Sequence, residues 1–339
     1  MAEKKIPVIY TLILAIAFSA VSFVLLKKYT TPTATATEQT NGSANSEKCN
    51  YTIARLKGYN YIKPLITEEP ECESKELASL KQDITALIDN EKQAGILNAA
   101  SVYIKEFSTD NWTSINPGES FLPGSLFKLP VLMTILKMSE TDPSLMSRKI
   151  TYQPQGVVDI KQTYVTKSLK PGQSYTVKEL LTYMIAYSDN SATQLLNRQI
   201  NPEVLIRIFS DLGLNPPKPN AADYMAYTIT TRDYSIFMAA LYNAAYLTIP
   251  NSEFATSLMA QCNFKDGLLK GLPADVKVAH KFGEAGTAQI HELHETGIVY
   301  FNNSAYLITV MTKGPDLKKL AETISEISKI TYARMKQNA

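Results

Sequence analysis

The chain has 339 residues, of which 45% are hydrophobic and 19% are charged. This balance is typical of a globular protein with a sizeable core, and the length suits one large domain or two small ones. The net charge is +2 and the 34 basic residues are scattered along the chain, so nothing favours nucleic acid as a partner. Three cysteines and three histidines without a C-x-x-C spacing argue against a structural zinc site.

The N-terminal segment predicts a membrane anchor. Residues 6–26 carry no charge, and a pair of lysines stands on each side of them. A helix of this length crosses a hydrocarbon core of about 30 Å. The apolar run is longer than that of a secretory signal peptide and ends in lysines, so we expect an uncleaved transmembrane helix within residues 1–28. The lysine counts on the two sides are equal and do not set its orientation.

Residues 29–48 are rich in Thr, Ala, Ser, Asn and Gly and predict a flexible linker, after which residues 49–339 form the folded domain. Cys49 and Cys72 flank a polar segment at the start of that domain. The sequence leaves open whether they pair, because pairing requires an oxidising compartment. Cys262 follows a helical run and is expected to be a buried, unpaired thiol.

Most predicted helices lie in one long block in the middle of the chain, and most predicted strands lie together near its end. Apolar spacing predicts a helix over 74–95, a strand over 101–107 and mostly helix over 125–262. Short runs of β-branched and aromatic residues then predict strands at 276–282, 296–301 and 305–312, with a hairpin at Asn302-Asn303, before a closing helix over 317–335. We therefore expect the α/β (α+β) class: an antiparallel sheet covered by the terminal helices, beside an all-helical lobe. A cleft between the two is the natural place for a site.

A possible nucleophile lies at the start of the helical part. Ser125-Leu126-Phe127-Lys128 is the only S-x-x-K in the chain, and a Pro-Gly turn precedes it. Ser125 is thus expected at a helix N-terminus, where backbone N–H groups favour negative charge. Lys128 would lie on the same helical face, close enough to take the serine proton. Pro130 is expected to distort the first turns of this helix.

Ser188-Asp189-Asn190 follows the helical run VKELLTYMIAY. A second hydroxyl can relay a proton to a leaving nitrogen, and an asparagine amide can hold both a lysine and a substrate carbonyl. The alternative is a turn in which Ser191 and Gln194 form a capping box for the next helix, and the two interpretations are compatible.

Lys281-Phe282-Gly283 is one of three K-x-G sequences; Lys170 and Lys265 begin the others. We favour Lys281 because a predicted strand precedes it and a predicted hairpin follows. On an edge strand, Gly283 would let a substrate backbone approach. The N–H of Glu284 would then form an oxyanion hole with that of Ser125.

The order S-x-x-K, S-D-N, K-x-G resembles that of class A serine β-lactamases and penicillin-binding proteins, over roughly residues 75–336. The phrases DGLLKGLP and ETGIVYF add to the resemblance. It implies a helical lobe beside a five-stranded antiparallel sheet, and an acyl-enzyme on Ser125 with Lys128 as base. Ser188 and Asn190 would assist, and Lys281 would supply electrostatic attraction. No metal or organic cofactor is expected.

The resemblance also implies a β-lactam or a D-Ala-type cell-wall peptide as substrate. The domain should then face outward from the cell membrane, held by its single N-terminal helix, while the oligomeric state stays open.

Two departures from the family pattern affect the expected chemistry. The glutamate of an E-x-x-L-N run, which clears the acyl-enzyme in class A β-lactamases, is absent; Asp223 is the one positional candidate, since Glu203 and Asp211 flank a helical run. Slow deacylation is therefore expected. Phe282 stands where the family has Thr or Ser, and no Lys or Arg occurs from Glu284 to residue 301. Carboxylate-bearing penicillins should therefore bind poorly.

Two alternatives remain. The chain could be a catalytically weak or inactive module that binds wall peptide or a protein partner. It could also be a purely structural anchor, but that role leaves Ser125, Lys128, Ser188 and Asn190 unexplained. Four further residues stand near the expected cleft but are better explained by loops and packing: Tyr224, Tyr227, His291 and His294.

Overall fold

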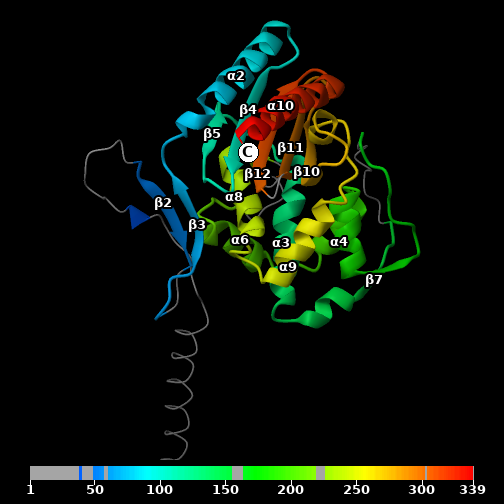
Figure 1. Ribbon diagram of the computed structural model, residues 1–339. Helices are drawn as coiled ribbons and strands as arrows, with labels where there is room; N and C mark the ends of the chain where they lie inside the picture. Colours follow the sequence, from blue (N-terminus) through cyan, green and yellow to red (C-terminus); the bar gives the residue numbers. More distant parts are fainter. Residues whose placement is uncertain are drawn as a thin grey trace, which may run out of the picture.

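A five-stranded antiparallel sheet forms the centre of the molecule (Figure 1). The computed structural model describes residues 38–39, 49–56, 60–154, 163–218, 226–301 and 304–338. The strand order is β10-β11-β12-β4-β5, and every neighbouring pair is antiparallel. The strands are β4 (Ala99–Glu106), β5 (Trp112–Ile115), β10 (Lys277–Gly286), β11 (His291–Phe301) and β12 (Ser304–Gly314). Strand β10 is thus an edge of the sheet.

Helices cover both faces of this sheet, and alternate residues of each strand serve opposite faces. In β12, Ile308 and Val310 join the core beneath α2 (Ala78–Gln93) and α10 (Leu317–Asn338). Leu307 and Met311, one residue out of step, join the core of the helical lobe. The period of two follows from strand geometry. Because both faces are buried, the strand appears in the sequence as a nearly continuous apolar run.

The all-helical lobe occupies the middle of the chain, as predicted. Its elements are α3 (Lys128–Ser139), α4 (Val177–Ala186), α5 (Asn190–Asn197), α6 (Pro202–Asp211), α8 (Thr231–Tyr242) and α9 (Ile249–Met259). Helix α4 begins with a capping box between Thr176 and Glu179, and Asp189 caps α5. Helix α3 is almost wholly buried, which explains its continuous apolar sequence.

Short elements complete the fold. They are the 3-10 turns η1 (Lys75–Leu77), η2 (Gly124–Phe127), η3 (Pro143–Ser147) and η4 (Leu268–Gly271), and the strand pairs β6 (Ser120–Phe121) with β9 (Ile229–Thr230) and β7 (Lys149–Thr151) with β8 (Ser174–Thr176). As the proline in its sequence suggested, the helix that bears the S-x-x-K begins as the 3-10 turn η2.

The N-terminal part of the domain is a small separate sheet, β1 (Glu38–Gln39), β2 (Tyr51–Arg55) and β3 (Leu65–Pro70). A disulfide joins Cys49 to Cys72 across its base. Cys262 is buried and unpaired. Strand β1 lies inside the segment that was expected to be a flexible linker. Its backbone pairs with β2 without the help of apolar side chains, so the composition of the segment did not predict a strand.

Two strand predictions need correction. The Lys281-Phe282-Gly283 motif does not follow a strand but lies inside β10, which continues to residue 286. Strand β11 begins at His291 rather than at Thr296, because its polar first half is buried through paired side chains. The predicted hairpin of β11 and β12 is present, with residue 301 opposite residue 304.

Within the described residues, no helix is both long and apolar enough to cross a membrane. The anchor expected within residues 1–28 lies outside the described residues.

Candidate active site

The turn that bears Ser125 rests directly on the edge of the sheet. Gly124 has a left-handed φ of 52°, and a Cβ added to it would come within 2.1 Å of the Glu284 carbonyl oxygen. On β10, a Cβ added to Gly283 would come within 2.6 Å of the Pro123 carbonyl oxygen. Neither position can hold a side chain without displacing backbone. Two glycines therefore bring the Ser125 turn and the Glu284 backbone together, as the expected oxyanion hole requires.

Lys128 lies one turn after Ser125 and is 4% exposed. Its Nζ donates to the Ser188 carbonyl at 2.6 Å and to the Asn190 Oδ1 at 2.9 Å, and lies 3.1 Å from the Ser188 Oγ. Burial, and then the positive charge of Lys281, holds the pKa of Lys128 well below its usual range. A buried lysine of this kind can lose its proton and act as a base.

Ser188 lies between the two lysines and is fully buried. Its φ of 58° turns the chain sharply between α4 and α5, while Asp189 next to it caps α5 by accepting from the Ala192 N–H at 2.6 Å. The N-cap of α5 is therefore Asp189, and not Ser191 as the alternative interpretation of the sequence expected. This leaves the Ser188 hydroxyl directed at the lysines.

Lys281 approaches the same hydroxyl from the sheet. Its Nζ donates to the Ser188 Oγ at 2.9 Å and to the Phe282 carbonyl at 2.8 Å. Burial lowers the pKa of Lys281 to about 8, although Cys262 and the carboxylates of Glu295 and Glu284 act in the opposite direction. Lys281 therefore remains mostly protonated at neutral pH and places a positive charge beside the Ser188 hydroxyl.

The Ser125 hydroxyl makes no hydrogen bond to any described residue, so the expected contact with Lys128 is not formed. The lysine is held instead by Ser188 and Asn190. Catalytic hydrogen bonds are often long in a free enzyme and tighten only when substrate binds. Lys128, Ser188 and Lys281 form a buried cluster, and Asn190 beside it is exposed, so a substrate can reach the Asn190 amide.

Phe282 and Glu284 do not offer the cleft a carboxylate-binding group. The Phe282 ring is 2% exposed and stacks on Phe264 with ring centres 4.6 Å apart. The Glu284 Oε2 accepts from the Thr163 N–H at 3.1 Å, and its Oε1 is buried without a partner among the described residues. Burial raises the pKa of the Glu284 carboxyl, against hydrogen bonds from Thr163 that lower it.

The other residues near the expected cleft have structural contacts. His294 is buried, with its Nε2 at 2.9 Å from the Leu122 carbonyl oxygen and its Nδ1 accepting from the Thr312 N–H at 3.3 Å. Tyr227 donates to the Asn215 carbonyl at 3.2 Å. His291 begins β11 and is partly exposed. Asp223 and Tyr224 lie outside the described residues.

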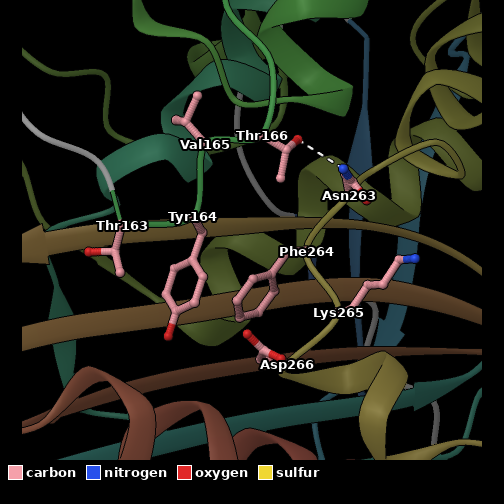
Figure 2. Close-up of a pocket in the computed structure, with 8 residues that line it drawn as sticks. All are labelled: Thr163, Tyr164, Val165, Thr166, Asn263, Phe264, Lys265 and Asp266. Carbon is pink, nitrogen blue, oxygen red and sulfur yellow. Dashed lines mark hydrogen bonds between the residues drawn. The ribbon is translucent and has the colours of Figure 1, made fainter.

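A pocket of about 330 Å³ lies next to this cluster, between segments 163–166 and 263–266 (Figure 2). Sequence reasoning did not find it. Its main side chains, Tyr164 and Phe264, stand far apart in the chain and belong to no motif, although Phe264 directly precedes the Lys265-Asp266-Gly267 sequence. In the described part of the chain, no group of three or more His, Cys, Asp or Glu residues is arranged to hold a metal ion.

Known proteins match this chain in sequence. A model described as the β-lactamase enzyme family matches residues 79–335. Beta-lactamase VEB-1 of Pseudomonas aeruginosa is 22% identical over 238 residues, which is 64% of this chain and 79% of that protein.

Many solved structures share the fold, among them the following three. PBP-A has a TM-score of 0.66 at 22% identity, over 78% of this chain and 99% of PBP-A. A PBP-A variant described as an acyl-enzyme complex with penicillin G has a TM-score of 0.63 at 22% identity, over 77% and 97% of the two chains. The class A beta-lactamase from Mycobacterium abscessus has a TM-score of 0.64 at 19% identity, over 76% and 99%. The chain belongs to the β-lactamase enzyme family and has the fold of its serine hydrolases.

Proposed function

We propose that the protein transfers an acyl group from an amide substrate to Ser125. Neutral Lys128 takes the proton of the Ser125 hydroxyl while the Ser125 oxygen attacks the substrate carbonyl. The N–H groups of Ser125 and Glu284 stabilise the negative oxygen of the tetrahedral intermediate. The C–N bond then breaks, the leaving nitrogen takes the Ser188 proton, and Lys128 returns its proton to Ser188. The products are a serine ester and a free amine.

The contact of the Ser188 hydroxyl with both lysines supports this sequence most directly. At 3.1 Å from Lys128 and 2.9 Å from Lys281, the hydroxyl can receive a proton from the first while the second stabilises its negative charge. A structural role alone does not explain two buried lysines that share one hydroxyl, because burying like charges together is costly.

We propose further that the ester is cleared slowly and that the substrate is a β-lactam or a D-Ala-type wall peptide. No E-x-x-L-N glutamate is present to activate water. Glu284 is the carboxyl nearest the Ser125 turn along β10, but its Oε2 is engaged by Thr163. The acyl-enzyme complex described for the PBP-A variant is consistent with a lasting adduct in this fold.

A second candidate is a binding module with weak or no turnover. The absence of a hydrogen bond from Ser125 to the described residues favours it, as does the apolar Phe282 at the family's hydroxyl position. In that case Asn190, Lys281 and the β10 edge hold a wall peptide or a protein partner without reaction.

One experiment separates the candidates. The full chain is incubated with a chromogenic cephalosporin and with a fluorescent penicillin, and its intact mass is followed over time. The proposal predicts a long-lived adduct that Ser125→Ala abolishes. Rapid turnover without a persistent adduct indicates an efficient β-lactamase and contradicts slow deacylation. No adduct and no turnover favour the binding module.

We also propose that the domain lies outside the cytoplasm, held at the cell membrane by residues 1–28. The disulfide of Cys49 and Cys72 supports an oxidising compartment. Fractionation of cells, followed by protease treatment of intact spheroplasts, tests this. Cleavage of the domain from outside is expected, and protection from the protease contradicts the proposal.

A further inference from the structure

The pocket between segments 163–166 and 263–266 is attached to the candidate active site from two sides. The Thr163 N–H donates to the Glu284 carboxylate on β10, and the Asn263 N–H donates to the Ala186 carbonyl at 2.9 Å, just before the Ser188 turn. The Asn263 side chain also donates to the Thr166 Oγ1 at 2.9 Å, which ties the two segments together (Figure 2). A group in the pocket therefore lies beside the reacting cluster.

Aromatic rings form one wall of this pocket. The Tyr164 ring stands almost perpendicular to Phe264, with ring centres 4.8 Å apart, and to Phe282, at 6.0 Å. Figure 2 shows the Tyr164 and Phe264 rings side by side in the lining. Phe264 and Phe282 are almost fully buried, whereas Tyr164 is half-buried and contributes surface to the pocket. Aromatic surface of this kind attracts cations through the negative face of the ring.

The charges around the Tyr164 ring are mainly negative. Burial, and then the nearby carboxylates of Asp266, Glu284 and Asp316, raises the pKa of the Tyr164 phenol to about 12. The phenol therefore stays neutral at physiological pH. Lys265 is the cation of the lining, but it is exposed and its side chain points away from both rings (Figure 2). A pocket with an aromatic wall and the Asp266 carboxylate in its lining is complementary to a positively charged group.

We infer that this pocket binds a primary ammonium group on the substrate, recognised by the Tyr164 ring and the Asp266 carboxylate. The inference rests on the proposed function in taking the bound group as part of the acyl donor. The substrate class is then an amide that carries an amine near the reacting bond. Such a group suits a site in which Phe282 replaces a carboxylate-binding hydroxyl.

Two small probes with the same carbon skeleton test the pocket without any acyl transfer. Nα-acetyl-lysine amide and Nα-acetyl-norleucine amide differ mainly in the terminal ammonium, and their binding to the full chain is measured by NMR titration. The lysine probe should bind about fivefold more tightly than the norleucine probe. Asp266→Asn and Tyr164→Leu should each reduce this preference, while Asp89→Asn, which removes an exposed carboxylate on α2, should leave it intact.

Equal binding of the two probes, or a preference that survives both pocket variants, would overturn the inference. The melting temperature of each variant shows whether the fold is retained. Acylation of Ser125 is measured on the same preparations. Acylation without the ammonium preference refutes the pocket and leaves the proposed function standing. The preference without acylation refutes the proposed function and leaves the ammonium site as part of a binding module.

Discussion

Lys281 donates a 2.9 Å hydrogen bond to the Ser188 hydroxyl, and both side chains are fully buried. Because Lys128 lies 3.1 Å from the same hydroxyl, two buried amino groups share one hydrogen-bonding partner. Burial and mutual repulsion favour loss of one proton from the pair. Because Lys128 is the lysine next to Ser125 in the chain, its neutral form is the one that the proposed chemistry needs.

Removal of the shared hydroxyl tests its role as a proton relay. Ser188→Ala should slow acylation of Ser125 by about 100-fold or more, because the leaving nitrogen loses its proton donor. Alanine has no greater difficulty than serine with the φ of 58° at this position, so the turn should persist. The rate is measured with a fluorescent penicillin. Ser191→Ala removes a hydroxyl that contacts Tyr152 instead and should leave the rate unchanged; equal losses in both variants would argue against the relay.

Acylation should depend on pH with a maximum below about 8. The rate should rise as Lys128, whose pKa is lowered, loses its proton, and fall as Lys281 becomes neutral near its pKa of about 8. Lys281→Arg keeps the charge at all pH values and should remove the falling limb from whatever activity remains. A falling limb at the same pH in this variant would contradict the assignment.

The same lysine should affect stability. Between its folded pKa of about 8 and its ordinary value of 10.5, the unfolded chain binds more protons than the folded chain at this position. The free energy of unfolding should therefore rise with pH across that interval. Lys281→Met should reduce the slope in urea unfolding measured from pH 8 to pH 10, and an unchanged slope would count against the lowered pKa.

The contact between the two glycines and the opposing backbone should tolerate no side chain. Gly283→Ala places a Cβ 2.6 Å from the Pro123 carbonyl oxygen, so the Ser125 turn must move. A loss of about 1–3 kcal/mol in the free energy of unfolding is expected, together with slower acylation. Gly118→Ala is the matched control, since its Cβ meets nothing within 4 Å. Wild-type acylation by the Gly283 variant would show that this close approach does not position the site.

Restoring a hydroxyl at position 282 should change substrate preference. Phe282→Thr should increase acylation by a penicillin carboxylate relative to its methyl ester, because a hydroxyl beside Lys281 can hold the carboxylate. The variant should lose about 3–5 kcal/mol of stability, since a buried aromatic side chain is removed. Phe264→Thr opens the same aromatic cluster without adding a group to β10, and should lose stability with no change in preference. A similar gain in both variants would point to loosened packing.

The sequence predicted the helical lobe, the terminal helices and four of the five strands of the central sheet, β4, β10, β11 and β12, because their apolar periods are regular. It did not predict β5, a four-residue strand with only two large apolar side chains, Trp112 and Ile115. The start of β11 was missed because HELHE has a polar sequence. Its Glu295 is buried by a 2.6 Å contact with His280, which only the folded register reveals.

The motifs brought together the residues expected to form the site, but local spacing could not show which contacts form. Lys128 is one helical turn from Ser125, yet its hydrogen bonds go to Ser188 and Asn190, some 60 residues away. The orientation of Phe282 depends on which face of β10 meets Phe264, and that contact joins segments with no shared motif. The pocket lined by Tyr164 could not be predicted for the same reason, because its two segments, 163–166 and 263–266, share no motif.

The central claim is that Ser125 becomes acylated. The most direct measurement is mass spectrometry of peptides from the full chain after prolonged exposure to an excess of penicillin G, because Phe282 is expected to weaken binding of the penicillin carboxylate. The account predicts a penicilloyl group on the peptide that contains Ser125, absent in Ser125→Ala and strongly reduced in Lys128→Ala. Ser120→Ala, an exposed serine of β6 in the same region, should not change labelling. Labelling at another residue, or no labelling of the folded wild-type chain, would contradict the account.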